Sequence, residues 1–412
     1  MTRNHARRNH YDRVKDSRSN YHLLTSNVVG KVLFSGKDAT GVCYLSTTAT
    51  NTACSSNVYA TKEVILAAGG FGTPKILQLS GIGRKKLLQK FGIPLVTDLP
   101  GVGQNLQDQP TLSVPYTCKL IRPYGSHRQP LSELTLHSHL VANNVSPNYG
   151  SLLTNATYNA EQRARYDAGQ SSAYTLVSSL SSNIGVLSLQ KATSSYRQII
   201  KAAGIRDPAL SLPADVDETV LAGYTAQRAA ILKQFASNDI GVGTVHWSTA
   251  DSALVYHLKP LSRGTVTINS TNPLENPLID FRTGTDPADV AVYTALFRKN
   301  RALFAAPSMQ ALGPTEAAPF GAQLTTDEQI YAVMRDQINP SNAHQCCTAA
   351  MMPLELGGVV SSQQKVYNVR RLRVADISAW PFQLSGAPMA TVYAAAERVS
   401  FLSLRYTCAP TY

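Results

Sequence analysis

The sequence has no long hydrophobic run and lacks several motifs that define common classes of protein. No apolar stretch approaches the ~20 residues needed to cross a bilayer, so we expect no transmembrane segment. The first twenty residues contain no apolar h-region, so we expect no signal peptide there. The absence of G-x-S-x-G argues against a serine hydrolase, and the absence of G-x-G-x-x-G argues against a nicotinamide enzyme with a Rossmann opening.

Cysteine is also scarce, and its spacing is not that of a metal site. The six cysteines form no C-x-x-C pair and lie at Cys43, Cys54, Cys118, Cys346, Cys347 and Cys408. Neighbouring cysteines cannot easily reach one tetrahedral ion, so no metal site is predicted. Cys43 and Cys54 flank a segment rich in Thr, Ser and Asn, and they would bridge a hairpin in an oxidising compartment.

The composition of the chain does not determine its cellular location or its binding partners. Sequons at Asn144, Asn155 and Asn269 are compatible with secretion but are common by chance. The net charge is +12, and residues 1–20 hold six basic residues against two acidic ones. That arm has no interleaved aromatics and no nucleic-acid motif, so we interpret it as a solvated surface without a nucleic-acid partner. With 412 residues, 43% hydrophobic and 16% charged, the chain is expected to fold as two domains.

The apolar patterns predict strands and helices in alternation. The expected strands cover residues 28–34, 41–45, 57–60, 265–268 and 372–375. The expected helices cover residues 196–203, 222–236, 288–304 and 389–400, the third of them capped at Asp286-Pro287.

The stretch from Val64 to Gln109 is the most informative part of the chain. Residues 64–68 form a short apolar run that is typical of a buried strand, and Gly69 and Gly70 break it. Thr73 is predicted to cap a helix that begins at Pro74. A strand, a glycine turn and a capped helix favour a phosphate at the helix N-terminus, although a structural crossover uses the same parts.

The order of residues in this stretch resembles a known family. GGFGTPKILQLSGIG followed by PGVGQNLQDQ is similar to the second signature of the glucose–methanol–choline (GMC) flavin oxidoreductases. SRGTVTINSTNPLENPLID and the segment LRVADIS resemble later passages of the same family. The family's opening strand–GxGxxG–helix has no counterpart in this sequence, so we expect an incomplete GMC fold that corresponds to the later part of the family.

The resemblance implies an α/β (α+β) fold in which an FAD-binding domain is discontinuous. Residues 1–110 would form its second part, and residues 336–412 would return to it with the catalytic segment. Residues 111–335 would form a substrate-binding domain with an antiparallel sheet and flanking helices. The implied cofactor is FAD, and the implied partner is a small-molecule alcohol or polyphenol; the oligomeric state is unknown.

The resemblance also implies the site residues. His344 occupies the position of the family's base in H-x-x-G-T-x-x-M, and an imidazole with an ordinary pKa of ~6.5 suits that role. Cys347 stands where the family has glycine. The second catalytic position is occupied by Ala387, whose methyl group cannot handle a proton, so we expect it to be inactive. The positions implied on the cofactor side are Val29, Ala68, Gly69, Asp376, Ile377 and Met389.

Without the family, the same residues have plainer interpretations. Val29 is a strand residue, Asp376 is a cap or turn at a strand end, and His344 is a hydrogen-bonded structural histidine. Three functions follow from the whole pattern. The first is an FAD-dependent oxidation of a CH–OH group in fungal secondary metabolism. The second is a non-redox cyclase or dehydratase, because SAWPFQLSGAPMATVYAAAERV resembles the fungal branch that contains versicolorin B synthase. The third is an inactive binding or scaffold protein.

Overall fold

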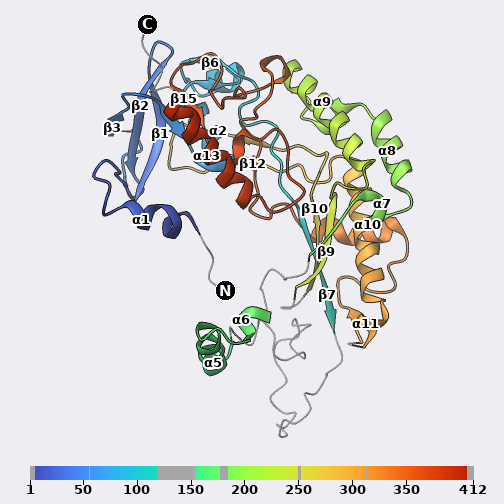
Figure 1. Cartoon of the computed structure of the whole chain (residues 1–412). Helices are drawn as coiled ribbons and strands as arrows, with labels where there is room; N and C mark the ends of the chain where they lie inside the picture. Colours follow the sequence, from blue (N-terminus) through green and yellow to red (C-terminus); the bar gives the residue numbers. More distant parts are fainter. Residues whose placement is uncertain are drawn as a thin grey trace.

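The computed structural model describes residues 5–54, 56–117, 152, 154–176, 184–248, 252–311 and 313–405. Helices and sheets alternate in it, which confirms the expected α/β (α+β) class. Figure 1 shows a small sheet of residues 27–59 (β1–β3) at one end and three helices, α8 (Tyr196–Ile205), α9 (Glu218–Phe235) and α10 (Pro287–Phe304), at the other. Among the described residues no helix is long and apolar enough to cross a membrane.

The N-terminal part contains the predicted small antiparallel sheet. Its strand order is β1-β2-β3, with β1 at Asn27–Ser35, β2 at Asp38–Ser46 and β3 at Ser56–Tyr59. Burial alternates along β2, as expected for a strand with one face in the core. Cys43 in β2 forms a disulfide with Cys54, which confirms the expected bridge. Two short helical turns precede the sheet, η1 at Arg7–Tyr11 and α1 at Asp12–Val14.

A parallel pair of strands joins the two ends of the chain. β4 (Val64–Leu66) pairs with β15 (Leu372–Val374), so Val64 faces Leu372 and Leu66 faces Val374. Helix α2 (Gly69–Leu79) follows β4 and buries Leu77 completely in the same apolar core. Burial of these aliphatic side chains stabilises the pairing of two segments that lie about 300 residues apart.

The start of α2 differs from the sequence prediction. The helix begins at Gly69 with Ala68 as its N-cap, so Pro74 lies inside the helix and Thr73 does not cap it. Thr73 is fully buried instead, and its hydroxyl accepts the Ala68 N–H at 3.1 Å. The early start is possible because Gly69 adopts a φ of +79°, which a residue without a Cβ reaches at little cost.

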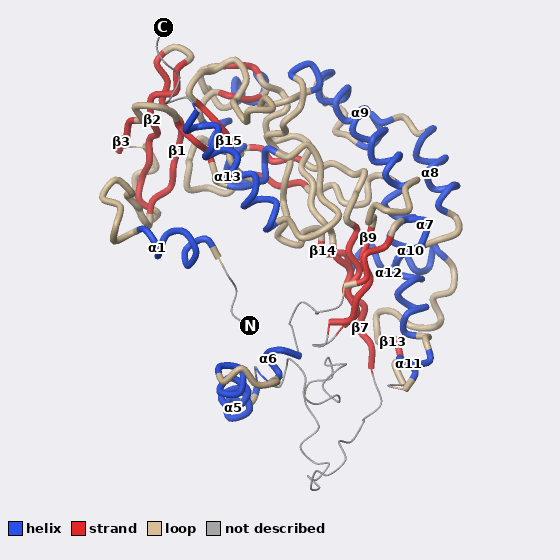
Figure 2. The backbone as a smooth tube through the Cα atoms, viewed as in Figure 1, coloured by secondary structure: helices blue, strands red, loops and turns tan. Residues whose placement is uncertain are grey.

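The larger sheet lies in the middle of the chain. Its strand order is β13-β7-β10-β9-β8, and β14 also pairs with β7. These strands are β7 (Thr111–Thr117), β8 (Gly185–Leu187), β9 (Gly243–Ser248), β10 (Ser252–His257), β13 (Thr315–Glu316) and β14 (Ile338–Asn339). Helices α7 (Leu189–Ala192), α8 (Tyr196–Ile205), α10 (Pro287–Phe304) and α12 (Asp327–Gln337) lie together on one side of it in Figure 2.

The part of the chain around β4 and β15 and the part around the larger sheet each have an apolar core. One contains buried residues between 32 and 102 together with residues between 349 and 379. The other contains buried residues between 112 and 334, including Leu112, Val255, Val292 and Phe297. The domain boundaries at 110/111 and 335/336 stay a prediction. As the sequence indicates, Asp286 caps α10 by accepting the Ala288 N–H at 3.0 Å.

The remaining elements are short connectors, apart from three longer helices. The longer ones are α5 (Ala156–Asp167), α9 (Glu218–Phe235) and α13 (Met389–Arg405). The short ones are β5 (Ile82–Gly83), α3 (Lys85–Lys90), β6 (Thr97–Asp98), α6 (Ala173–Leu176), η3 (Pro208–Ser211), β11 (Thr265–Thr267), β12 (Leu278–Asp280), α11 (Pro307–Gln310), η4 (Leu354–Leu356) and η5 (Ile377–Ala379).

Candidate active site

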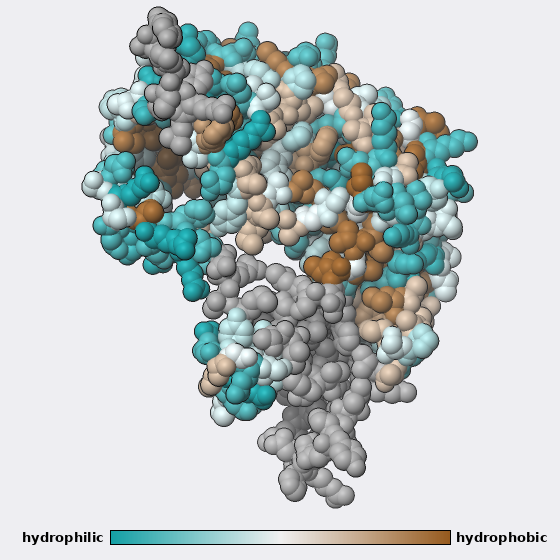
Figure 3. Space-filling model, in the orientation of Figure 1, coloured by the Kyte–Doolittle hydropathy of each residue, from teal (hydrophilic) through white to brown (hydrophobic). Residues whose placement is uncertain are grey.

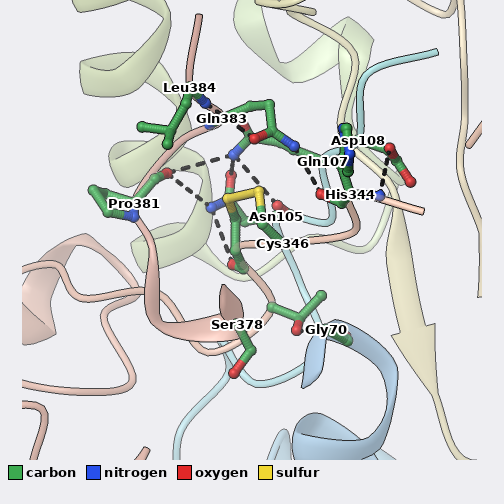
Figure 4. The surroundings of a disulfide bond; sticks show 12 residues. Gly70, Asn105, Gln107, Asp108, His344, Cys346, Ser378, Pro381, Gln383 and Leu384 are labelled. Carbon is green, nitrogen blue, oxygen red and sulfur yellow. Dashed lines mark hydrogen bonds between the residues drawn. A yellow bond between two sulfur atoms is a disulfide. The ribbon is translucent and has the colours of Figure 1, made fainter. Parts of the chain in front are cut away.

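Three loops meet where the two regions of the chain come together. They are residues 104–109, which follow the glycine-rich signature, residues 344–348, and residues 381–386 (Figure 4). The first two loops are joined by a backbone bridge between Gln107 and Cys346. The side-chain amide of Asn105 donates to the carbonyls of Cys347 at 3.2 Å and Pro381 at 3.3 Å. One half-buried amide therefore links two loops to a third.

His344 and Gln109 form the central contact of this site. The His344 Nδ1 lies 2.7 Å from the Gln109 Oε1. The amide nitrogen of Gln109 donates to the carbonyls of Leu384 at 2.9 Å and Gly386 at 3.0 Å, which fixes the orientation of the amide. Its oxygen must then face His344, so the imidazole carries its proton on Nδ1 and keeps the lone pair on Nε2. Nε2 makes no hydrogen bond to any residue that the structure describes.

The backbone of His344 is also held on both sides. Its N–H donates to the Asp108 Oδ1 at 3.3 Å, and its carbonyl accepts the Gln383 side-chain amide at 2.8 Å. Asp108 also accepts the Ser341 hydroxyl at 2.6 Å, so the turn before His344 is anchored. Burial lowers the pKa of His344 below its ordinary value, and the charge of Asp108 opposes that shift only in part. The imidazole is therefore neutral at neutral pH.

Cys346 and Cys347 form a disulfide with each other inside this loop. Both side chains are completely buried and pack against Trp380. Cys347 adopts a φ of +77°, the left-handed conformation that glycine reaches most easily. Both cysteines are bonded to sulfur, and the described residues contain no group of side chains that could hold a metal ion.

Asp376 organises the turn between β4 and α2. Its Oδ2 accepts the Gly69 N–H at 2.9 Å and the Thr73 hydroxyl at 2.5 Å, and its Oδ1 accepts the Ser378 N–H at 2.8 Å. The structure thus places two of the predicted cofactor-side residues, Asp376 and Gly69, in direct contact. The carboxylate caps η5 as well, which confirms the plainer interpretation of Asp376 as a strand-end cap, and its role on the cofactor side stays a prediction.

A groove opens beside the same turn. It has a volume of about 440 Å³, and Val29 and Ala68 both line it. Most of its other lining is apolar, and Ile65 (43% exposed) and Tyr59 (70% exposed) show that this surface is uncovered. Figure 3 shows hydrophobic atoms in a hollow beside the β1–β3 sheet. A Cβ added to Gly69 would meet nothing within 4 Å, so this part of the backbone faces open space.

The remaining predicted residues are Ile377, Ala387 and Met389. The Ile377 carbonyl accepts the Cys347 N–H at 3.2 Å, which places Ile377 directly behind the disulfide. Ala387 is exposed, and Met389 is 61% exposed at the start of α13. The methyl group of Ala387 can form no hydrogen bond. The side chain that contacts the His344 ring is that of Gln109.

Reasoning from the sequence missed Gln109 and Asp108 as members of the site. They lie 235 and 236 residues before His344, so no local pattern links them to it. The signal was their place in PGVGQNLQDQ, directly after the glycines that allow the loops to approach each other. Gly103 illustrates this approach, because a Cβ there would lie 2.1 Å from the Val266 carbonyl.

Comparisons with known proteins match this chain over most of its length. Two models of the GMC oxidoreductase family match the chain, one at residues 3–111 and one at residues 260–396. The chain is 46% identical over 401 residues to the dehydrogenase xptC of Emericella nidulans, covering 97% of this chain and 60% of that protein. It is 34% identical over 345 residues to the versicolorin B synthase stcN of the same species, covering 83% of this chain and 46% of that protein.

A solved structure is similar over nearly the whole chain. It is an FAD-dependent oxidoreductase from Chaetomium thermophilum, with 65% identity and a TM-score of 0.88, and the match covers 98% of this chain and 65% of that one. The chain belongs to the GMC oxidoreductase family. It spans about three fifths of the length of xptC and just under two thirds of the Chaetomium protein.

Proposed function

We propose that this protein is an FAD-dependent oxidoreductase that oxidises a CH–OH group of a small molecule to a carbonyl, with His344 as the base. The observation that carries the proposal is the contact between His344 and Gln109, which leaves Nε2 unprotonated and without a partner among the described residues. A neutral imidazole with a free nitrogen is what proton abstraction from an alcohol requires. Family membership and the FAD-dependent relative support the redox assignment.

Two features of this chain fit a flavin. The groove at Val29 and Ala68 is large and apolar, and the Gly69 turn beside it faces open space. We assign the cofactor side to Val29, Ala68, Gly69, Asp376, Ile377 and Met389. When bound, FAD supplies a hydride acceptor. The role of His344 is to take the hydroxyl proton on Nε2, while Gln109 holds the ring in the tautomer that can accept it.

The substrate class that we propose is an alcohol or a polyphenol of fungal secondary metabolism. The support comes from two relatives in the fungus Emericella nidulans, one named as a dehydrogenase and the other as a versicolorin B synthase. The domains are proposed to be 1–110 with 336–412 on the cofactor side and 111–335 on the substrate side. Secretion is compatible with the Cys43–Cys54 disulfide, because such bonds persist in oxidising compartments.

A test of the proposal begins with the flavin. The purified 412-residue chain, alone and after incubation with FAD, is scanned for flavin absorbance between ~350 and ~500 nm. If flavin binds, candidate alcohols are screened anaerobically for bleaching of that absorbance, and His344→Ala should bind flavin but lose the bleaching. Protein that stays colourless contradicts the redox function of this chain. Equal bleaching rates in both proteins would remove His344 from the mechanism.

A second candidate is a non-redox cyclase or dehydratase. Ala387 favours it, because the position that carries a second proton-handling side chain in the family holds a methyl group here. His344 would then act as the only base, and the flavin would stay oxidised during turnover. The two candidates separate in one experiment, since the first predicts bleaching of the flavin and the second predicts a product that has lost water without any bleaching. An inactive scaffold predicts neither result.

A further inference from the structure

Asp108 is a buried acidic residue that forms no ion pair with any residue that the structure describes. It is 3% exposed. Its Oδ1 accepts the backbone N–H groups of Gln109 at 2.7 Å, Asn342 at 3.1 Å and His344 at 3.3 Å. Its Oδ2 accepts the Ser341 hydroxyl at 2.6 Å. The side chain is therefore held by neutral donors alone.

The pattern of hydrogen bonds indicates that Asp108 is ionised. Ser341 Oγ accepts the Ala343 N–H at 3.1 Å and the Gln345 side-chain amide at 3.0 Å, so both of its lone pairs are used and its own proton points to Asp108. A proton on the carboxyl group would find no acceptor among the described residues. A buried charge without a partner of opposite sign is costly, so its presence beside the site indicates a task that needs the charge.

The group that lies beside this carboxylate is the imidazole of His344 (Figure 4). Asp108 Oδ1 lies 3.3 Å from the backbone nitrogen of His344, and the ring is joined to that nitrogen through Cα and Cβ. Bond lengths of ~1.5 Å keep the nearer ring atoms within about 8 Å of the carboxylate in any rotamer. Burial lowers the pKa of His344, and the charge of Asp108 raises it. The buried cations Lys259 and Arg263 contact carbonyl and amide oxygens of the neighbouring loops.

We propose that Asp108 is the counter-charge for the imidazolium that His344 becomes when it takes the substrate proton, a role that rests on the proposed function. When the O–H bond breaks, its proton moves to Nε2 and the ring gains one positive charge, while the hydride leaves the carbon for the flavin. The carboxylate is already held in place, so it stabilises this charge without any rearrangement of the loop. The attraction grows as the proton moves, so it speeds the reaction rather than tightening substrate binding. Asp108 is thus a positioning residue that acts through His344.

Asp108→Asn removes the charge and keeps the shape of the side chain. The asparagine Oδ1 can still accept the three backbone N–H groups. Its Nδ2 can donate to Ser341 Oγ once the Gln345 amide turns over to accept the hydroxyl proton. Ser341→Ala is the matched control, because it loosens the same turn while it keeps the carboxylate. An NMR titration of the His344 ring should show a lower pKa in Asp108→Asn than in the parent protein, and no lowering in Ser341→Ala.

A titration of the parent protein tests the same coupling without any substitution. The NMR signal of the Asp108 carboxylate carbon should move with the midpoint of the His344 ring, because charged groups that interact titrate together. His344→Ala should abolish this movement. A carboxylate signal that does not follow the ring overturns the proposal, even if Asp108→Asn fails to fold.

The rate at which a substrate alcohol bleaches the flavin tests the role of Asp108 in the reaction. Asp108→Asn should lower kcat about tenfold or more with little change in KM, because the charge acts as the proton moves. The proposal fails if the pKa of His344 is unchanged in Asp108→Asn, if it falls equally in Ser341→Ala, or if kcat keeps its parent value. A parent protein that never bleaches contradicts the proposed function instead, and the two titrations then decide whether Asp108 is the counter-charge of His344.

Discussion

The Nδ1 of His344 lies 2.7 Å from the Oε1 of Gln109, and this contact decides which nitrogen of the imidazole is free. Gln109 cannot turn its amide around without losing its two hydrogen bonds to the carbonyls of Leu384 and Gly386. The loop of residues 381–386 thus sets the tautomer of a histidine that lies some forty residues earlier in the chain. The effect of Gln109 on the His344 ring can be measured.

Replacing Gln109 by glutamate should raise the pKa of His344. A carboxylate in place of the amide would stabilise the imidazolium, and a charge this close shifts a pKa by about one unit or more. In the parent protein, burial lowers the pKa of His344, so the rise expected in the variant is opposite in direction to the effect of burial. The measurement is a titration of the His344 ring by NMR, assigned with His344→Ala. Gln109→Leu is the matched control and should not raise the pKa. An unchanged pKa in Gln109→Glu would mean that the two side chains are not in contact.

Asp376→Ala should destabilise the fold and impair the turn at Gly69. The carboxylate accepts hydrogen bonds from Gly69, Thr73 and Ser378, and its loss leaves three donors without partners. We expect a loss of about 3 kcal/mol in the free energy of unfolding, measured by urea denaturation. Thr73→Val removes one of the three hydrogen bonds to the carboxylate together with the bond from the Ala68 N–H, and it should cost less, about 2 kcal/mol. If the two variants lose the same stability, the carboxylate is not the organising group.

Replacing one partner of the buried ion pair between Arg228 and Asp286 should strongly destabilise the fold. The Arg228 and Asp286 side chains are 3% and 0% exposed, and Asp286 also caps α10 and accepts the Ser211 hydroxyl at 2.8 Å. Asp286→Ala leaves a buried cation alone, so we expect a loss of about 3–5 kcal/mol in unfolding free energy. Asp327→Ala breaks the exposed pair with Arg298 and should cost less than about 1 kcal/mol. Equal losses would contradict the burial of the Arg228–Asp286 pair.

His246 should make the fold sensitive to acid. Its ring is 2% exposed, neither ring nitrogen has a hydrogen-bond partner among the described residues, and burial lowers its pKa to about 4. In the unfolded chain the ring takes up a proton near pH ~6.5. Between these values the unfolded state binds more protons, so stability falls as the pH drops from about 6.5 to about 4, by up to about 3 kcal/mol.

The test compares variants by urea denaturation at pH 7, 5.5 and 4.5. His246→Leu removes the titrating ring and should lose much less stability between pH 7 and pH 4.5 than the parent does. His22→Leu replaces an exposed histidine and should behave like the parent. A His246→Leu variant that loses stability with acid as steeply as the parent would show that other groups cause the acid sensitivity.

The sequence by itself determined the local structure and the family. Short apolar runs predicted β1 and β2, and Asp286-Pro287 marked the start of α10. The glycine-rich signature and its downstream passages identified the family through residues that are near one another in the chain. These features depend on backbone preferences and on burial of one face, which act over a few residues. The predicted start of α2 was wrong because the prediction considered Thr73 and Pro74 only with their neighbours in the chain. The hydroxyl of Thr73 donates instead to Asp376, which lies 303 residues away.

Only the tertiary structure decided how the site is held. The tautomer of His344 depends on Gln109, the burial of Arg228 depends on its ion pair with Asp286, and the bond between Cys346 and Cys347 lies in a left-handed turn of the backbone. None of these is visible in a sequence pattern, because hydrogen bonds and charges act between side chains that packing brings together from distant segments. The family pattern located the histidine, but the fold decided which of its nitrogens is free.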